Sequence, residues 1–420
     1  MLRQNPRAVF NRLVAFIYRT VFRALARIWK PTPCKLRSSE IRAILVFSAA
    51  GIGDTLTDSV AIRALKETFR KATVSVVTHR RRAALARHNP YADEIISYHK
   101  SFWRFFQLAR LLRRKKPDVV VMLRGNDPDL WPLAWIANRR AVVSWPGMTR
   151  FAFLIAYPVD IPDWDHLHGV EQTLRIVGVL GAETKDKRLV YETREVERFQ
   201  MRERLERHGL RPEDPIVIFQ VGGGRRGSWR DWPTEHYVEL GRELLRRYRA
   251  RLVLTGGIEH YEKAVRIQAD LPGGVINFTG RVRLEEMAAL LASAKILVST
   301  DTGIMHLGFA VGVDTLALIH CNNPAHRVGP YGYADRHLVA QLEPPKGVSV
   351  STDVPMSLLT PAAVWAKLET LCRRHRLEPV SSARPPSVAA ERGKTVTPAP
   401  LPQAVASAAR TPPSASRRRG

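Results

Sequence analysis

Short apolar runs alternate with amphipathic segments through residues 42–372. The runs are rich in β-branched residues, which favours buried strands. In the first half they are AILVFS (43–48), TVSVVT (73–78), EIISY (94–98) and DVVVML (118–123). A polar, helical segment near 190–210 follows, and the pattern begins again with IVIFQV (216–221), RLVLTGG (251–257), VINFTG (275–280), KILVST (295–300) and TLALIH (315–320). Buried β-branched runs joined by helices predict a parallel sheet in each half.

The two halves predict an α/β fold of two Rossmann-like, doubly wound parallel-sheet domains with a cleft between them. We expect the first domain over residues 41–195 and the second over residues 211–375. Sheets of this kind bind ligands at the carboxyl ends of their strands. The loops that follow the predicted strands are therefore the places to look for functional residues.

Residues 1–40 form a basic amphipathic segment ahead of the first strand. At about 100° per residue on a helical projection, seven apolar side chains share an arc of ~120°. They are Phe10, Leu13, Val14, Ile17, Val21, Leu25 and Ile28. Arginines interrupt the segment every few residues, which excludes a transmembrane span and fits a cleavable signal peptide poorly. The pattern favours a helix on an anionic membrane surface; the alternative is that its apolar face docks on the protein's own body.

The chain has 420 residues and a formal net charge of +27, which by itself suggests a nucleic-acid or membrane partner. Ten Lys and Arg oppose one acid in residues 1–42, and ten oppose two in residues 373–420, so the ends carry +17 of the total. The body is only mildly basic and has no nucleic-acid recognition motif, so nucleic acid is not an expected partner. Residues 378–420 have almost no large apolar side chain and predict a disordered basic tail rich in Pro, Ala and Ser. The three cysteines lie far apart, which fits reduced thiols in a cytosolic protein.

The first glycine loop, Gly51-Ile52-Gly53-Asp54, directly follows a predicted strand. It is not a dinucleotide-binding fingerprint, because the third glycine is absent and Asp54 stands where a phosphate would approach. A carboxylate at a helix start often only caps the helix. The functional alternative is that Asp54 is a general base facing the cleft.

The second glycine loop spans residues 222–233 and also lies between a strand and a helix. Gly222 and Gly223 let backbone N–H groups approach an anion, and Arg226 and Arg230 supply positive charge. This combination predicts a phosphate or pyrophosphate site. The alternative is an ordinary solvated basic loop.

A third candidate is the stretch VSTDTGIMHLGFAVG at 298–312. The N–H groups of Thr302 and Gly303 at a helix start suit a phosphate, whereas Asp301 would repel one and is expected to order the turn or bind hydroxyls. His306 is either a core histidine or a site residue. A further loop at 322–332, after the last predicted strand, is well placed to line a cleft.

Two D-x-D sequences, at 127–129 and 163–165, match a divalent-metal pattern. Such short matches are common by chance, and neither clearly ends a predicted strand as that use requires. We therefore expect no metal site.

These loops, taken in order, resemble glycosyltransferase family 9, the ADP-heptose:lipopolysaccharide heptosyltransferases. The likeness covers roughly residues 41–332. It rests on G-x-G-D (51–54), W-P (232–233), F-T-G-R (278–281), S-x-D-T-G-x-x-H (299–306) and P-x-x-R-x-G-P-Y-G (324–332). His168 to Glu171 is also similar to the family's H-x-x-E sequence.

The resemblance implies a GT-B fold and an inverting transfer of a heptose-like sugar from a nucleotide-diphosphate donor, such as ADP-heptose, with no further cofactor. The implied acceptor is a lipopolysaccharide core or another lipid-linked glycan. Asp54 matches the catalytic base, and the donor side takes Gly222, Gly223, Arg226, Arg230, Asp301, Thr302, Gly303 and His306, with Glu259 or Glu262 at the ribose. Gly51, Gly53, Arg124 and His168 fall on the acceptor side.

Several features depart from the family pattern. Arg230 replaces the usual lysine, and VMLRG at 121–125 lacks the acid of the family's "D-L-Q-G" strand end. The N-terminal segment and the basic tail are additions. We expect a cytoplasmic enzyme held on the cytoplasmic side of the inner membrane by its N-terminal helix. The alternative functions are a nucleotide-sugar epimerase on the same scaffold and a basic nucleic-acid-binding protein.

Overall fold

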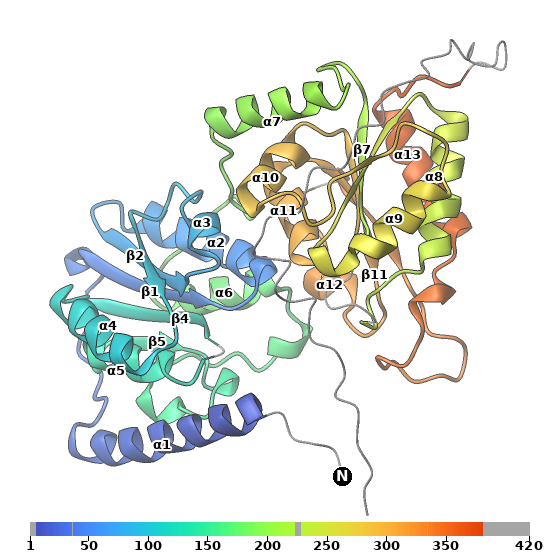
Figure 1. Ribbon diagram of the computed structural model, residues 1–420. Coiled ribbons are helices and arrows are strands. Elements are labelled where there is room, and N and C mark those ends of the chain that lie inside the picture. Colours follow the sequence, from blue (N-terminus) through green and yellow to red (C-terminus); the bar gives the residue numbers. More distant parts are fainter. Residues whose placement is uncertain (1–5, 36, 126, 223–227, 334, 381–420) are drawn as a thin grey trace, which may run out of the picture. The chain divides into compact units, whose positions relative to one another are not determined.

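The computed structural model describes residues 6–35, 37–125, 127–222, 228–333 and 335–380. The predicted disordered tail at 378–420 lies almost wholly outside these residues. Within them the chain forms two six-stranded sheets (Figure 1), and every strand pair in both sheets is parallel.

The first sheet has the strand order β3-β2-β1-β4-β5-β6. Its strands are β1 (Ala43–Ala49), β2 (Thr73–His79), β3 (Glu94–Tyr98), β4 (Val119–Gly125), β5 (Val142–Ser144) and β6 (Tyr157–Pro158). The helices of this half are α1 (Pro6–Ile28), α2 (Ile52–Thr68), α3 (Ala83–Ala86), α4 (Phe102–Arg114), α5 (Leu130–Asn138) and α6 (Gly169–Gly178). The polar linking segment forms α7 (Glu195–Arg207).

The second sheet repeats the first, with the order β12-β11-β10-β7-β8-β9. Its strands are β7 (Ile216–Gln220), β8 (Arg251–Thr255), β9 (Ile276–Asn277), β10 (Ile296–Thr300), β11 (Asp314–Ile319) and β12 (Leu338–Gln341). Its helices are α8 (Thr234–Arg247), α9 (Tyr261–Ala269), α10 (Leu284–Ala292), α11 (Gly303–Val311), α12 (Ala325–Val328) and α13 (Pro361–Arg374).

Both sheets follow the doubly wound strand order 3-2-1-4-5-6, so the predicted α/β fold class is confirmed. The strand order reverses between β1 and β4 in one sheet and between β7 and β10 in the other. Sequence reasoning missed β5, β6 and β12. These strands lie at or next to a sheet edge and have between two and four residues, too few to show a pattern.

The apolar runs are continuous because both faces of each sheet are covered. In β1, Leu45 and Phe47 belong to the cluster shared with α1, α4 and α5, whereas Ile44 and Val46 face the cluster that contains α2. The second sheet is likewise packed between two clusters of buried residues. Successive side chains of a strand point to opposite faces, so each of these strands needs an apolar residue at every position.

The N-terminal helix α1 packs on the first domain mainly through side chains outside the predicted apolar face, with Leu25 of that face beside them. Phe22 and Ala26 are buried, and the Phe22 ring meets the edge of Trp135 at a centroid distance of 5.7 Å. Tyr18 lies 5.2 Å from the ring of Phe105 on α4. The helix therefore docks on the body, as the alternative held, but mostly through side chains that the alternative did not assign to the docking face. None of the described helices combines the length and apolarity that crossing a membrane requires.

Candidate active site

The two switch points border one cavity of about 350 Å³. The first domain lines it with the start of α2, the end of β4 and the start of α6; the second lines it with Arg230, the start of α11 and the loop after β11. In doubly wound sheets the switch point leaves a crevice that loops on either side cannot cover. Its lining includes Gly51, Gly53, Asp54, Arg124, Arg230, Asp301, Thr302, Gly303 and His306, nine of the residues singled out from the sequence.

Asp54 lies in the first turn of α2, where the strand β1 has just ended. Its Oδ2 accepts a hydrogen bond of 2.8 Å from the backbone N–H of Gly51. A Cβ at residue 51 would lie 2.9 Å from that same oxygen, so a glycine there makes room for the contact. The Asp54 side chain remains 38% exposed, and the carboxylate both caps the helix and faces the cavity.

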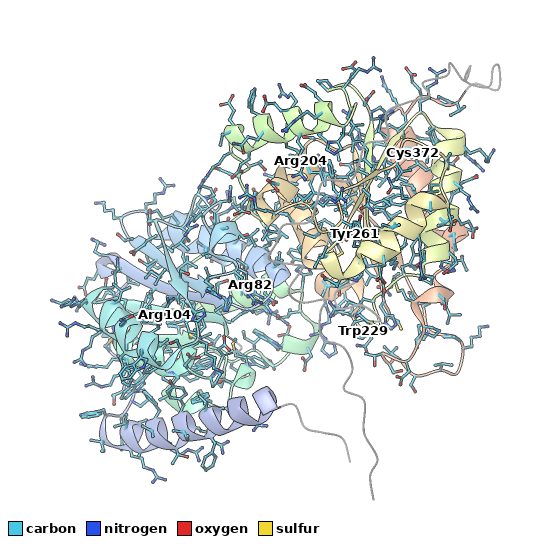
Figure 2. All side chains as sticks on the ribbon, viewed as in Figure 1. Arg82, Arg104, Arg204, Trp229, Tyr261 and Cys372 are labelled. Carbon is cyan, nitrogen blue, oxygen red and sulfur yellow. The ribbon has the colours of Figure 1, made fainter. Side chains whose placement is uncertain are left out.

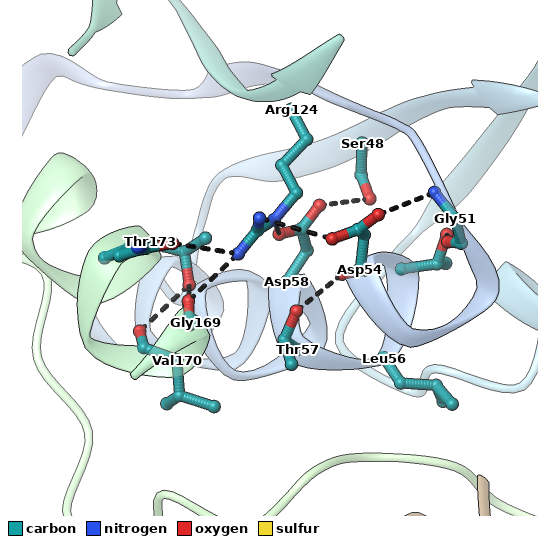
Figure 3. A network of polar contacts seen from close by, with 12 residues as sticks. Ser48, Gly51, Asp54, Leu56, Thr57, Asp58, Arg124, Gly169, Val170 and Thr173 are labelled. Carbon is teal, nitrogen blue, oxygen red and sulfur yellow. Dashed lines mark hydrogen bonds and ion pairs between the residues drawn. The ribbon is translucent and has the colours of Figure 1, made fainter. Parts of the chain in front are cut away.

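Arg124 links Asp54 to a second carboxylate that the sequence analysis did not single out (Figure 3). Its Nη1 lies 3.2 Å from Asp54 Oδ1, and its Nε donates to Asp58 Oδ1 at 3.0 Å. The other oxygen of Asp58 accepts a hydrogen bond of 2.6 Å from the Ser48 hydroxyl. The remaining Arg124 nitrogen, Nη2, donates to the Gly169 carbonyl at 3.2 Å. All three guanidinium nitrogens are thus engaged, which holds the arginine in one orientation.

The β-sheet itself aims Arg124 at this position. The pairing of β1 with β4 shifts register after Phe47, so that Ser48 lies opposite Arg124. An irregularity of this kind turns a side chain toward a new direction and is frequent beside active sites. The shift brings the Ser48 hydroxyl and the Arg124 guanidinium to the same carboxylate.

Asp58 and Asp54 differ in what they can do. Asp58 is fully buried, and burial raises its pKa to about 6 although the Arg124 charge and the Ser48 hydrogen bond oppose the rise. Burial lowers the pKa of Arg124, but the charges of Asp58 and Asp54 outweigh that effect and leave it raised.

The spacing of Asp54 and Asp58 was a signal in the sequence. Two like charges four residues apart on a helix repel each other, so the pair indicates that a cation lies nearby.

Asp301 lies in the opposite wall of the cavity, which the second domain forms. Asp301 is buried; its Oδ2 accepts a 2.6 Å hydrogen bond from the Asn323 amide and lies 3.5 Å from Arg230 Nη1. The same arginine nitrogen donates to the Asp301 carbonyl at 3.2 Å, and the guanidinium lies over the Trp229 ring. These contacts leave the Asp301 carboxylate ordering the turn, while Thr302 and Gly303 begin α11 at the cavity wall.

Two glycines allow the starts of α2 and α11 to touch. A Cβ at Gly53 would lie 2.6 Å from Cδ2 of His306, and a Cβ at Gly303 would lie 2.5 Å from the Cβ of Ile52. Contacts that close do not occur between real side chains, so each position needs glycine for this approach. The second glycine of G-x-G-D and the glycine of D-T-G therefore serve the contact between the domains.

His306 closes this contact from the second domain. It is buried, and its Nε2 lies 4.0 Å from Asp301 Oδ1. Burial lowers the pKa of His306, and the Asp301 and Asp54 carboxylates oppose that change. The histidine thus combines the two alternatives drawn from the sequence, because it is a packed residue that also borders the cavity.

His168 is buried between the domains and is absent from the cavity lining. Its Nδ1 accepts a hydrogen bond from Val170 N–H at the start of α6, and its Nε2 lies 3.1 Å from the Gly329 carbonyl of the second domain. The ring stacks on Tyr331 at 4.4 Å, and the Tyr331 hydroxyl donates to Glu171. The H-x-x-E and P-Y-G sequences therefore form one interdomain contact.

The expected ribose side of the donor site is only partly described. Gly222 follows β7, and a Cβ there would lie 2.5 Å from the His260 ring, so this glycine permits close packing of the loops after β7 and β8. Glu259 follows β8, on the strand next to β7, and is absent from the cavity lining. Gly223 and Arg226 lie outside the described residues.

Other cavity residues were not singled out from the sequence. Gln172, Thr57 and Arg327 line it, and the last comes from the 322–332 loop that was expected to border a cleft. Arg82, labelled in Figure 2, lies after β2 and outside the cavity lining; burial lowers the pKa of its guanidinium, and the Asp54 and Asp127 charges oppose that change. Arg327 is the arginine of the P-x-x-R-x-G-P-Y-G motif, whereas Gln172, Thr57 and Arg82 belong to no motif that marks chemistry in a single sequence.

The acids of the D-x-D sequences have structural partners. Asp129 is buried and accepts a 2.6 Å hydrogen bond from the Tyr98 hydroxyl, and Asp163 pairs with Arg175 at 2.6 Å. Asp127 lies two residues beyond the end of β4, closer to a strand end than the sequence suggested. Within the described ranges, no three His, Cys, Asp or Glu side chains gather as metal ligands would.

Comparisons with known proteins agree with this arrangement. The model of glycosyltransferase family 9 (heptosyltransferase) matches residues 105–353, more than half of the chain. Lipopolysaccharide heptosyltransferase 2 of Salmonella typhimurium is 25% identical over 296 residues, 67% of this chain and 83% of that protein. Lipopolysaccharide heptosyltransferase 1 of Pseudomonas aeruginosa is 32% identical over 129 residues, 30% of this chain and 34% of that protein.

Two solved structures share the fold. A glycosyl transferase family 9 protein from Veillonella parvula matches 82% of this chain and 100% of its own with a TM-score of 0.70 and 21% identity. The ADP-heptose lipopolysaccharide heptosyltransferase II of E. coli matches 80% of this chain and 99% of its own with a TM-score of 0.66 and 21% identity. The GT-B fold is therefore confirmed. Neither the epimerase nor the nucleic-acid alternative gains support from the family match. With one family model over more than half of its length and one cavity between two doubly wound sheets, the chain belongs to glycosyltransferase family 9, the heptosyltransferases, and is a glycosyltransferase.

Proposed function

We propose that this enzyme transfers a heptose from ADP-heptose to a sugar hydroxyl of a lipopolysaccharide core, with inversion at the anomeric carbon and Asp54 as the general base. The names of its relatives support the donor and the acceptor class, because they are lipopolysaccharide heptosyltransferases, one of them an ADP-heptose enzyme. The single observation that carries the proposal is the cavity. It sets a half-exposed carboxylate of one domain opposite an arginine and a helix N-terminus of the other.

The second domain supplies what a departing nucleoside diphosphate needs. Negative charge develops on the diphosphate as the bond to the sugar breaks. Arg230 and the N–H groups at the start of α11 can stabilise that charge. Arg327, which also lines the cavity, brings a second guanidinium within the same space. In this role Thr302 and Gly303 hold the phosphate, and Asp301 orders the turn that presents them.

The first domain supplies the base. Of the two carboxylates held by Arg124, only Asp54 reaches the cavity, because the Asp58 side chain is fully buried. Asp54 accepts the proton of the acceptor hydroxyl while that oxygen attacks the anomeric carbon from the face opposite the diphosphate. The new carbon–oxygen bond forms, the bond to the diphosphate breaks, and ADP leaves with that bond's electron pair. Arg124 orients the carboxylate for this step.

The test compares the wild type with Asp54→Asn, using ADP-heptose and a heptose-deficient lipopolysaccharide core. We expect kcat, measured as ADP release, to fall by about 10²–10⁴ in the variant, because it lacks the base. Calorimetry should find ADP affinity unchanged, since the donor groups lie on the other domain. Asp160→Asn, an exposed aspartate of the first domain, is the matched control.

Each part of the proposal has its own contradicting result. Turnover at the wild-type rate by Asp54→Asn would remove Asp54 from the mechanism. A thermal-shift screen of nucleotide sugars in which another donor stabilises the enzyme and ADP-heptose does not would exclude the donor. Retention of the donor's anomeric configuration in the product, read by NMR, would exclude inversion.

A further inference from the structure

The helix α1 has an apolar face that the protein itself does not cover. Phe22 and Ala26 bury one side of the helix against α4 and α5. Ile17, Val21 and Ile28 point elsewhere and are 49%, 47% and 71% exposed. At about 100° per residue these three side chains fall within ~40° of one another, and roughly 140° around the helix from the buried pair. Docking therefore leaves Ile17, Val21 and Ile28 of the predicted apolar stripe open, whereas Leu25 packs against the first domain.

The exposed stripe lies on a helix whose charges are all positive. The sequence of α1 contains five arginines and no Asp or Glu. The neighbouring helix α4, whose Phe105 meets Tyr18 of α1, contains four arginines and likewise no acid. Figure 2 labels one of these arginines, Arg104.

The exposed side of α4 carries large apolar side chains and arginines on one face. Trp103 and Phe106 are 75% and 55% exposed. On the helical projection they fall beside Arg110 and Arg113, within an arc of ~80°. Two adjacent helices thus present large apolar side chains among arginines.

We propose that the outward faces of α1 and α4 bind an anionic phospholipid surface, with Ile17, Val21 and Ile28 inserted at the headgroup boundary. The stripe of α1 supplies apolar side chains for the headgroup boundary, and on α4 the exposed Trp103 and Phe106 fall among arginines whose guanidinium groups can meet lipid phosphates. A second copy of the chain fits less well, since a symmetric contact through α1 and α4 would bring together two helix pairs that carry nine arginines each and no acid.

The inference goes beyond the proposed function and holds whatever sugar is transferred. Because α1 is packed on the first domain, membrane binding through it would hold the domain that carries Asp54 at the lipid surface. The helix then acts as a rigid part of the enzyme rather than as a tether. A helix that bound lipid with the face that here meets Trp135 would first have to leave the first domain, whereas α1 can bind lipid while it stays packed.

The test is co-sedimentation of the full-length protein with vesicles of phosphatidylcholine alone or mixed with phosphatidylglycerol. We expect binding to the phosphatidylglycerol vesicles that weakens in high salt. The triple variant Ile17→Ser, Val21→Ser, Ile28→Ser should lose at least about tenfold in partitioning, since three apolar side chains leave the interface. The matched control is Val348→Ser with Val350→Ser, two exposed valines of the second domain, which should bind as the wild type does.

Three results would overturn the inference. They are unchanged vesicle binding by the triple variant, equal binding of the wild type to both vesicle types, and a dimer in light scattering that disappears in the triple variant. Because the three side chains are exposed, the variant should unfold like the wild type. Its sugar transfer to a detergent-dispersed acceptor should also persist, so failure of this inference and failure of the proposed function are distinguishable.

Discussion

Replacing Arg124 by glutamine removes the cation that contacts both Asp54 and Asp58. Asp58 lies in the interior, so it cannot exchange the lost partner for water. An unpaired buried carboxylate takes up a proton instead of remaining charged. The variant should therefore be destabilised by an amount that depends on pH.

The size of the effect follows from the pKa of Asp58. Burial raises this pKa from 3.8 to about 6 in the wild type, with Arg124 present. Each pH unit corresponds to about 1.4 kcal/mol, so an ionised Asp58 costs the wild-type fold about 3 kcal/mol, and this cost stops growing above pH 6. In the variant the pKa rises further, and the cost of holding Asp58 protonated keeps growing with pH. This further rise in the pKa of Asp58 should lower the free energy of unfolding of Arg124→Gln, relative to the wild type, by only a few tenths of a kcal/mol at pH 6 and by about 2–3 kcal/mol at pH 8.

Urea denaturation at pH 6 and pH 8 measures both free energies of unfolding. Arg175→Gln is the matched control, because its pair with Asp163 is 45% and 42% exposed and should contribute less than about 1 kcal/mol at either pH. A destabilisation of Arg124→Gln that is equal at both pH values would falsify the idea that a charged Asp58 is held by Arg124.

Three further predictions concern the rest of the site. Gly53→Ala should lower the free energy of unfolding by about 1–3 kcal/mol in thermal unfolding, because its Cβ would lie 2.6 Å from the His306 ring. The control Gly178→Ala should not destabilise the protein, because its Cβ meets nothing within 4 Å. Equal melting temperatures for the two variants would contradict the close approach. Arg230→Ala should weaken ADP binding in calorimetry by about tenfold or more, and an unchanged affinity would place the diphosphate elsewhere. Burial lowers the pKa of His168 to about 4, so the unfolded chain binds a proton that the folded protein excludes, and stability should fall by up to about 3 kcal/mol between pH 6.5 and pH 4. His168→Gln should reduce that slope, and an acid-unfolding curve identical to the wild type would show that the histidine is protonated in the fold.

The sequence by itself determined the two sheets and the edge at which the site lies. A strand covered on both faces needs an apolar residue at every position, so runs such as 43–48 and 295–300 predict parallel strands from local information. The carboxyl ends of those strands carry the glycine loops, which is why Asp54, Arg230 and the 301–306 stretch could be singled out in advance. The period of α1 predicted an apolar stripe, but not which part of it stays exposed.

The tertiary structure decided the pairings. Arg124 and Asp58 are 66 positions apart in the chain, and their contact depends on a register shift between β1 and β4 that no local pattern encodes. The face of α1 that docks depends on where Trp135 and Phe105 stand on other helices. Gly303 was expected to contact phosphate and Gly53 to lie on the acceptor side, yet both are required because two helices from different domains meet there. The period of a sequence predicts which side chains share one face of an element, but only the packing of the whole chain determines what each face contacts.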